Sequence, residues 1–304
     1  MKIRRMLQGA LLTASLLSVA APPAMAAGDG SKVHPVSHVE KNTSQILKYW
    51  TPARMATASP VTSRNAETLL PAGPPSGTPS AHYSSGSKVI GALFFNNGSG
   101  GHYCTASVIN ASQQNLLLTA AHCLYDPDKH RWNSNVAFVP GYSAGHRPHG
   151  VWPIWMMAVD KRWTGNADQD LDFGFAAVNG RIAHTLGYNT IWINEGFHRW
   201  VTIIGYPARD HNHNPPDKPI ECTNYTFKQA TYQQGFDCKG FYNGTSGSPW
   251  MLSYDSRRQT GYVIGALGGY QRGGAYDWRS YSAVFDNDIL KLRKYANDCQ
   301  PSHC

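Results

Sequence analysis

From Val89 onward the chain is a series of short runs of apolar and β-branched residues, separated by Gly, Pro and Asn. Runs of this length, bounded by turn residues, predict β-strands. Their number and spacing favour an all-β barrel or sandwich. The expected strands are residues 89–95, 106–109, 116–119, 136–140, 172–178, 201–206, 262–267 and 282–285.

Near the C-terminus the periodicity changes. Ile289, Leu292 and Tyr295 recur at helical spacing, so a single closing helix is expected over residues 288–296. No internal repeat accompanies it.

Two segments precede the strands. Basic residues followed by a short apolar run and the small residues Ala24-Met25-Ala26 predict a signal peptide over residues 1–26, by the general or the twin-arginine export route. Residues 27–88 are rich in Pro, Ser, Thr, Gly and Ala, and such a composition buries little apolar surface. They are expected to form a propeptide or a disordered leader, whose one apolar cluster, a weak helical patch at residues 44–50, could dock on the folded domain.

Charge argues against a polyanionic partner. The chain has a formal charge of +8, but nine of its 27 basic and three of its 19 acidic residues lie in residues 1–88. The remaining 18 basic and 16 acidic residues are nearly balanced, and no dense basic run with interleaved aromatics occurs. We therefore expect no nucleic-acid partner, and no membrane partner after signal removal.

Six cysteines in an exported chain indicate three disulfides, although six cysteines allow 15 pairings. A Cys104–Cys123 bridge would hold the loop beside His122. Cys222–Cys238 and Cys299–Cys304 are the economical remaining pairs, and the pairing of these later cysteines stays open. No Cys-x-x-Cys pair occurs, so no metal site is expected.

Three motifs carry residues suited to nucleophilic catalysis. They are His122 in Thr-Ala-Ala-His-Cys, Asp172 in Asp-Phe-Gly-Phe and Ser246 in Gly-Thr-Ser-Gly-Ser-Pro. A serine hydroxyl is a poor nucleophile at neutral pH and needs an imidazole to take its proton and a carboxylate to orient that imidazole. The glycines beside Ser246 would leave the backbone N–H groups of Gly244 and Ser246 open to a substrate oxyanion. The order of the three residues and the Ser at position 248 exclude an α/β-hydrolase elbow.

Over residues 89–296 the chain resembles chymotrypsin-fold, trypsin-like serine peptidases, notably secreted bacterial members that include the glutamyl endopeptidase type. The resemblance implies a peptidase domain at residues 89–304, with two packed antiparallel six-stranded-type barrels at about 89–185 and 186–285 and the active site in the cleft between them. It implies His122 as base, Ser246 as nucleophile and, among Asp168, Asp170 and Asp172, the last as the orienting carboxylate.

In this family the substrate pocket is formed by the segment before the nucleophile and the strand after it. The corresponding residues are Gly240, Leu267, Gly268, Gly269 and Tyr270. Neither an Asp at position 240 nor a His at position 267 is present, so the resemblance gives no cleavage preference. Gly268 replaces a Ser that commonly supports the catalytic Asp.

The activation signals of the family are altered. Thr245 stands where digestive relatives have the Asp that receives a new N-terminal ammonium. The run from Lys88 to Gly91 nevertheless resembles the start of a mature peptidase domain, which suggests processing near Lys88.

The sequence thus predicts a secreted, monomeric serine endopeptidase that acts on protein or peptide substrates without a cofactor. The alternatives are a peptidase-fold binding protein without turnover and an esterase on the same fold.

Overall fold

The computed structural model of the chain describes residues 33–61, 73–208, 218–300, 302 and 304. The expected signal peptide lies outside the described residues.

The first of two β-barrels is a closed six-stranded antiparallel sheet. Its strands follow the order β10-β11-β6-β5-β4-β9, and β9 pairs in turn with β10. Leu116, Leu117 and Leu118 are all fully buried, because both faces of β6 are covered. The strands are β4 (Ile90–Asn96), β5 (Gly101–Val108), β6 (Leu116–Thr119), β9 (Ser134–Pro140), β10 (Trp152–Asp160) and β11 (Gly174–Val178).

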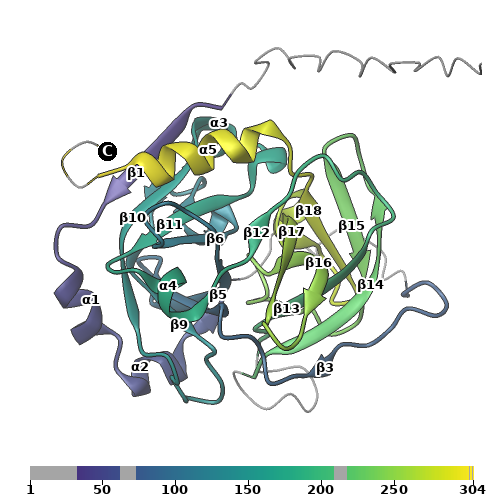
Figure 1. Ribbon diagram of the computed structural model, residues 1–304, viewed down its shortest axis with the longest axis horizontal. Helices are drawn as coiled ribbons and strands as arrows, with labels where there is room; N and C mark the ends of the chain where they lie inside the picture. The colour runs from purple at the N-terminus through teal and green to yellow at the C-terminus, as the bar shows by residue number, and fades with distance from the viewer. Residues whose placement is uncertain (1–32, 62–72, 209–217, 301, 303) are drawn as a thin grey trace, which may run out of the picture. The chain divides into compact units, whose positions relative to one another are not determined.

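The second barrel has the strand order β17-β16-β13-β14-β15-β18 (Figure 1). A hydrogen bond from the Gly268 N–H to the Tyr281 carbonyl, 2.9 Å long, links the two ends of this series. Two short strands extend the sheet, since β12 (Thr190–Ile191) pairs with β17 and β3 (His82–Tyr83) pairs with β14. The barrel strands are β13 (Trp200–Gly205), β14 (Ile220–Lys228), β15 (Gln233–Asp237), β16 (Pro249–Asp255), β17 (Thr260–Ala266) and β18 (Arg279–Ala283).

The all-β fold with two barrels is therefore confirmed, and so is the closing helix. That helix, α5 (Asn287–Asp298), is capped by Asp286, whose side chain accepts from the Asp288 N–H. It lies on barrel one, against β10 and β11 (Figure 1). Shorter elements are α3 (Lys161–Asn166), α4 (Ile182–Leu186), η1 (Ala121–Cys123), η2 (Gln169–Leu171), η3 (Tyr270–Gly273) and the hairpin of β7 (Tyr125–Asp126) and β8 (Arg131–Trp132).

Residues 33–61, part of the segment expected to be a propeptide or a disordered leader, form regular structure on the domain. This segment, here called the N-terminal wrap, follows the outside of barrel one (Figure 1). Its strand β1 pairs with β10 and its β2 pairs with β5. Between them Ile46, Trp50 and Met55 are 1–2% exposed, so the apolar patch expected at residues 44–50 does dock on the domain. The elements are β1 (Pro35–Val39), α1 (Thr43–Tyr49), α2 (Pro52–Thr57) and β2 (Ser59–Pro60).

The junction at Lys88 is also packed. Val89 and Ile90 are fully buried, and the Lys88 N–H donates to Gln259 Oε1 at 2.8 Å. A cut after Lys88 would therefore free a chain end inside the fold.

The cysteines form Cys104–Cys123, Cys222–Cys238 and Cys299–Cys304. Within the described residues, no helix combines the length and the apolar character needed to cross a bilayer.

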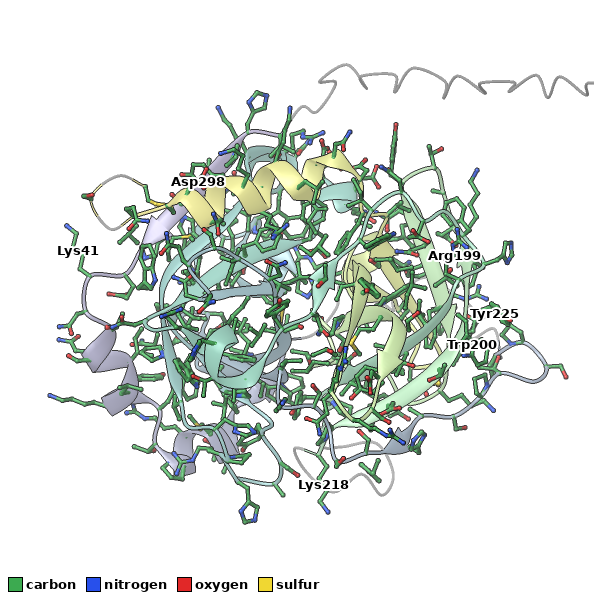
Figure 2. The ribbon with its side chains drawn as sticks, in the orientation of Figure 1. Lys41, Arg199, Trp200, Lys218, Tyr225 and Asp298 are labelled. Carbon is green, nitrogen blue, oxygen red and sulfur yellow. A yellow bond between two sulfur atoms is a disulfide. The ribbon has the colours of Figure 1, made fainter. Side chains whose placement is uncertain are left out.

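Exposed aromatic residues occur on the outer side of barrel two. Trp200 and Tyr225 face one another across β13 and β14, with ring centroids 4.7 Å apart (Figure 2). They are 53% and 58% exposed. Neither belongs to the three motifs or to the segments of the expected substrate pocket.

Candidate active site

His122 is held at the end of β6 by two constraints. It lies in the short turn η1, and the next residue, Cys123, is bonded to Cys104 on β5. Its side chain is 2% exposed and its Nδ1 atom lies 2.8 Å from Asp172 Oδ2 and 3.0 Å from Asp172 Oδ1. The other ring nitrogen, Nε2, is buried and has no hydrogen-bond partner among the described residues. One nitrogen of the imidazole is thus hydrogen-bonded to Asp172, and the other is left without a partner among the described residues.

Asp172 is the carboxylate that faces His122. It follows η2 and precedes β11, which pairs with β6, so the sheet brings it beside the histidine. In addition to the imidazole, the backbone N–H of His122 donates to Oδ1 at 3.0 Å and that of Gly269 donates to Oδ2 at 2.9 Å. The two competing aspartates have other contacts: Asp168 accepts from the Asp170 N–H, and Asp170 accepts from Gln233.

The Ser246 turn is pressed against barrel one. Gly247 has φ +84°, and a Cβ there would lie 2.1 Å from the Thr105 carbonyl oxygen. Gly244 has φ +94°, and a Cβ there would lie 2.6 Å from the Tyr206 carbonyl oxygen. The sequence predicts that these glycines leave the N–H groups of Gly244 and Ser246 open to a substrate, but their surroundings show a more direct cause. Both positions have backbone conformations and packing distances that only glycine accommodates.

The amide groups of this turn divide into two kinds. The Gly247 N–H donates to the Leu267 carbonyl at 2.7 Å and the Ser248 N–H to the Thr245 carbonyl at 3.0 Å. The N–H groups of Gly244 and Ser246 have no acceptor among the described residues, although both residues are buried. Buried backbone donors are rarely left unpaired, so two in one turn are typical of a site that binds an anion or oxyanion.

A cluster of potential metal ligands lies nearby, but its chemistry is already used. In the described part of the chain, the side chains close enough to share a metal ion are Cys104, His122 and Cys123. Both sulfur atoms are in the disulfide, which leaves one imidazole as a ligand.

Comparison with known proteins decides the family. The family model described as Trypsin matches residues 75–277, two thirds of the chain. The chain belongs to the trypsin family. This membership makes the protein a serine endopeptidase by class.

Solved structures agree at the level of the fold. The protease Anisep from Arthrobacter nicotinovorans is 23% identical, with a TM-score of 0.63 over 72% of this chain and 100% of its own. AL20, a thermostable serine protease from an extremophilic microorganism, is 23% identical. Its TM-score is 0.64, and the match covers 71% of this chain and 100% of AL20. A Glu endopeptidase in complex with MPD is 17% identical. Its TM-score is 0.60, and the match covers 73% of this chain and 99% of that protein. None of the curated proteins compared with the chain matches it.

The trypsin-family position that usually supplies a Ser to the catalytic Asp is Gly268 here. A Cβ at Gly268 would lie 3.0 Å from Asp172 Oδ2 and 2.9 Å from the Asp172 carbonyl oxygen. The support comes instead from the next residue, since the Gly269 N–H occupies that side of the carboxylate. A backbone donor replaces a side-chain hydroxyl, and the residue type at position 269 gave no sign of it.

Gln233 is a second contributor that sequence reasoning missed. Its Nε2 donates to Asp170 Oδ1 at 2.8 Å and to the Gln169 carbonyl at 3.0 Å, while its Oε1 accepts from the Tyr270 N–H at 2.9 Å. One amide therefore joins the segment before Asp172 to the segment that contains Gly269. The Gln-Gln pair at the start of β15 carries no motif, so only the fold could reveal the role of Gln233.

The five expected pocket residues have four different surroundings. Gly268 and Gly269 lie against Asp172, and Leu267 is 4% exposed and packed in the core of barrel two. Tyr270 is 38% exposed, and its ring meets that of Tyr281 edge-on.

The remaining pocket position, Gly240, donates its N–H to the Asp277 carbonyl at 3.0 Å. The side chain of Asp277 also bonds Tyr242. Burial and then that carboxylate raise the pKa of the Tyr242 phenol, which stays neutral at physiological pH.

Proposed function

We propose that this protein is a secreted serine endopeptidase in which Ser246, His122 and Asp172 form the catalytic triad. The observation that carries the proposal is a buried His122–Asp172 pair whose Nε2 is free, together with two unpaired amides in the turn of Ser246. The His122–Asp172 pair would hold a general base in a fixed orientation. The two amides provide donors for the negative charge that develops on the substrate carbonyl oxygen.

The reaction proceeds in two steps. The Ser246 hydroxyl oxygen bonds to the carbonyl carbon while His122 Nε2 takes its proton, and the Gly244 and Ser246 amides bind the oxyanion. The C–N bond then breaks as His122 returns the proton to the leaving amine, which leaves an acyl group on Ser246. Water attacks this ester by the same route and releases the acid. Asp172 stabilises the imidazolium in both steps, and none of the steps requires a cofactor.

Secretion is part of the proposal. The predicted signal peptide at residues 1–26 supports it, and so do the disulfides, which form in oxidising compartments. The substrates are proteins or peptides, and the protein is proposed to act as a monomer.

The test is digestion of a diverse peptide mixture, read by mass spectrometry, with wild type and Ser246→Ala. We expect cuts by wild type and a loss of about 10⁶-fold in kcat for the variant. Ser37→Ala is a control, because that hydroxyl is hydrogen-bonded to Tyr295 on α5 and takes no part in the site. A fluorophosphonate probe should add to Ser246 in wild type and not in Ser246→Ala.

Other outcomes separate the alternatives. Correctly folded wild type that neither cuts peptides nor reacts with the probe would be a binding protein on a peptidase fold. Reaction with the probe and with simple esters, but with no peptide, would indicate an esterase.

A further inference from the structure

Thr105 lies where barrel one meets the turn of Ser246. It is fully buried on β5, next to the disulfide-bonded Cys104. Its backbone N–H donates to the Ser246 carbonyl at 2.7 Å. Its hydroxyl donates to the Gly244 carbonyl at 3.1 Å and accepts from the Tyr206 N–H at 3.0 Å. A single residue of barrel one therefore bonds both residues proposed as oxyanion donors.

These bonds fix the backbone around those donors. Gly244 has no side chain to restrict its rotation, so the direction of its N–H depends on what holds the adjacent peptide groups. The Thr105 hydroxyl holds the peptide group that follows Gly244, and the Thr105 N–H holds the one that follows Ser246. Because neither carbonyl can turn without losing a buried hydrogen bond, both proposed donors keep their orientation.

Within residues 244–248, which the structure describes, no ion pair holds the backbone of the turn in place. Thr245 occupies the position of the aspartate that fixes the turn in digestive relatives, and it is 1% exposed. Its hydroxyl donates to the Tyr242 carbonyl at 2.7 Å, which closes the turn on itself. Besides Thr105, Leu267 holds the turn from outside: its carbonyl accepts from the Gly247 N–H at 2.7 Å, and its N–H donates to the Ser248 carbonyl at 2.9 Å.

We propose that Thr105 is a positioning residue that holds the oxyanion-binding turn in its catalytic form through its hydroxyl group. The inference rests on the proposed function of Ser246 and its neighbouring amides. On this proposal, contacts within the folded chain form the turn, and no ammonium of a newly cut N-terminus is needed to form it.

The experiment compares two pairs of side chains that differ in the hydroxyl. Thr105→Val retains shape, and Thr105→Ala is compared with Thr105→Ser at nearly equal size. Each hydroxyl-free variant leaves the Gly244 carbonyl and the Tyr206 N–H unpaired. We expect kcat to fall about 10- to 100-fold, part of the 100- to 1000-fold cost of losing one oxyanion donor. KM should change less than threefold, and Thr105→Ser should keep kcat within about fivefold of wild type.

A second readout separates positioning from general loosening. A peptide aldehyde forms a tetrahedral adduct with an oxyanion, so its Ki should rise by the factor by which kcat/KM falls. Thr226→Val is the control, because Thr226 is 1% exposed on β14 of barrel two and its hydroxyl accepts from the Arg199 N–H, just before β13. It removes the hydroxyl of a buried threonine and one partly buried hydrogen bond outside the site, and it should leave kcat unchanged.

The outcomes are distinct. Thr105→Val with kcat within twofold of wild type, equal losses in Thr105→Ser and Thr105→Ala, or a loss confined to KM would each overturn the role of Thr105. If Thr105→Val does not fold, the Ser and Ala pair decides. A folded wild type without peptidase activity would instead overturn the proposed function, which the Thr105 variants do not test.

Discussion

Asp172 differs from its two acidic neighbours in what it contacts. Its carboxylate accepts from the His122 ring, the His122 N–H and the Gly269 N–H, whereas Asp168 caps η2. The orienting function of a catalytic carboxylate depends on the ring contact, and the capping function does not. The three aspartates, so similar in the sequence, therefore have separable roles.

Replacing Asp172 or Asp168 by asparagine tests these two roles separately. Asp172→Asn should lower kcat by about 10⁴-fold, because an amide favours the wrong imidazole tautomer. Asp168→Asn should cost less than tenfold, since asparagine also serves as a cap. Steady-state kinetics on a peptide identified in the digestion would measure both. Comparable losses in the two variants would contradict the assignment of Asp172.

At the scale of single elements, helix α1 and its flanking residues decide how the N-terminal wrap is bound. Trp50 is 2% exposed, its ring centroid lies 5.3 Å from that of Phe94, and its indole N–H donates to the Asn135 carbonyl. Leu47, one turn earlier, is 47% exposed. The wrap is thus fastened to barrel one by one face of the helix.

Trp50→Ala should lower the free energy of unfolding by about 3–5 kcal/mol, because it opens a cavity between the wrap and barrel one and removes the donor to the Asn135 carbonyl. Leu47→Ala, on the solvent face, should change it by less than about 0.5 kcal/mol. Chemical denaturation in a Ser246→Ala background, which prevents self-digestion, measures both. Equal, small effects would mean that the wrap adds little to the stability of barrel one.

Strand β14 carries a carboxylate whose titration is linked to stability. Burial raises the pKa of Glu221 above its ordinary 4.5, and the nearby His82 partly opposes the shift. An acid with a raised pKa in the folded state contributes stability that is present below its unfolded pKa and lost as the pH rises through its folded pKa. Glu221→Gln keeps a neutral group at every pH. Its Tm should therefore match wild type near pH 4 and exceed it at pH 8, by differential scanning calorimetry; a constant difference across this range would refute the linkage.

For the whole molecule, the features that could be predicted from the sequence are those formed by residues adjacent in the chain. The His122, Asp172 and Ser246 motifs are short runs, and the apolar strands of barrel one have clear boundaries. Strands β10, β14, β15 and β16 were not predicted, because their residues are of mixed polarity or include Pro, Gly and Gln. Pairing with neighbours far along the chain makes them strands, and local pattern does not contain that information.

The same reasoning applies to the site. Thr105, Gln233 and Gly269 are ordinary residue types in unremarkable surroundings, and their roles arise from contacts between residues 37 to 141 positions apart. The strands of the N-terminal wrap were not predicted, for a related reason. Its composition is that of a disordered segment, but a few well-spaced apolar residues suffice when a finished barrel offers them a surface.

Both ends of the described chain lie on barrel one. The His34 N–H donates to Asp160, Arg162 joins that carboxylate to Asp288 on α5, and Ser37 lies 2.8 Å from the Tyr295 hydroxyl. The barrel that contains His122 and Asp172 is therefore made first but finished last, since its outer layer needs residues synthesised after Ser246. A chain that emerges from its N-terminus therefore lacks the outer layer of this barrel until α5 has emerged as well.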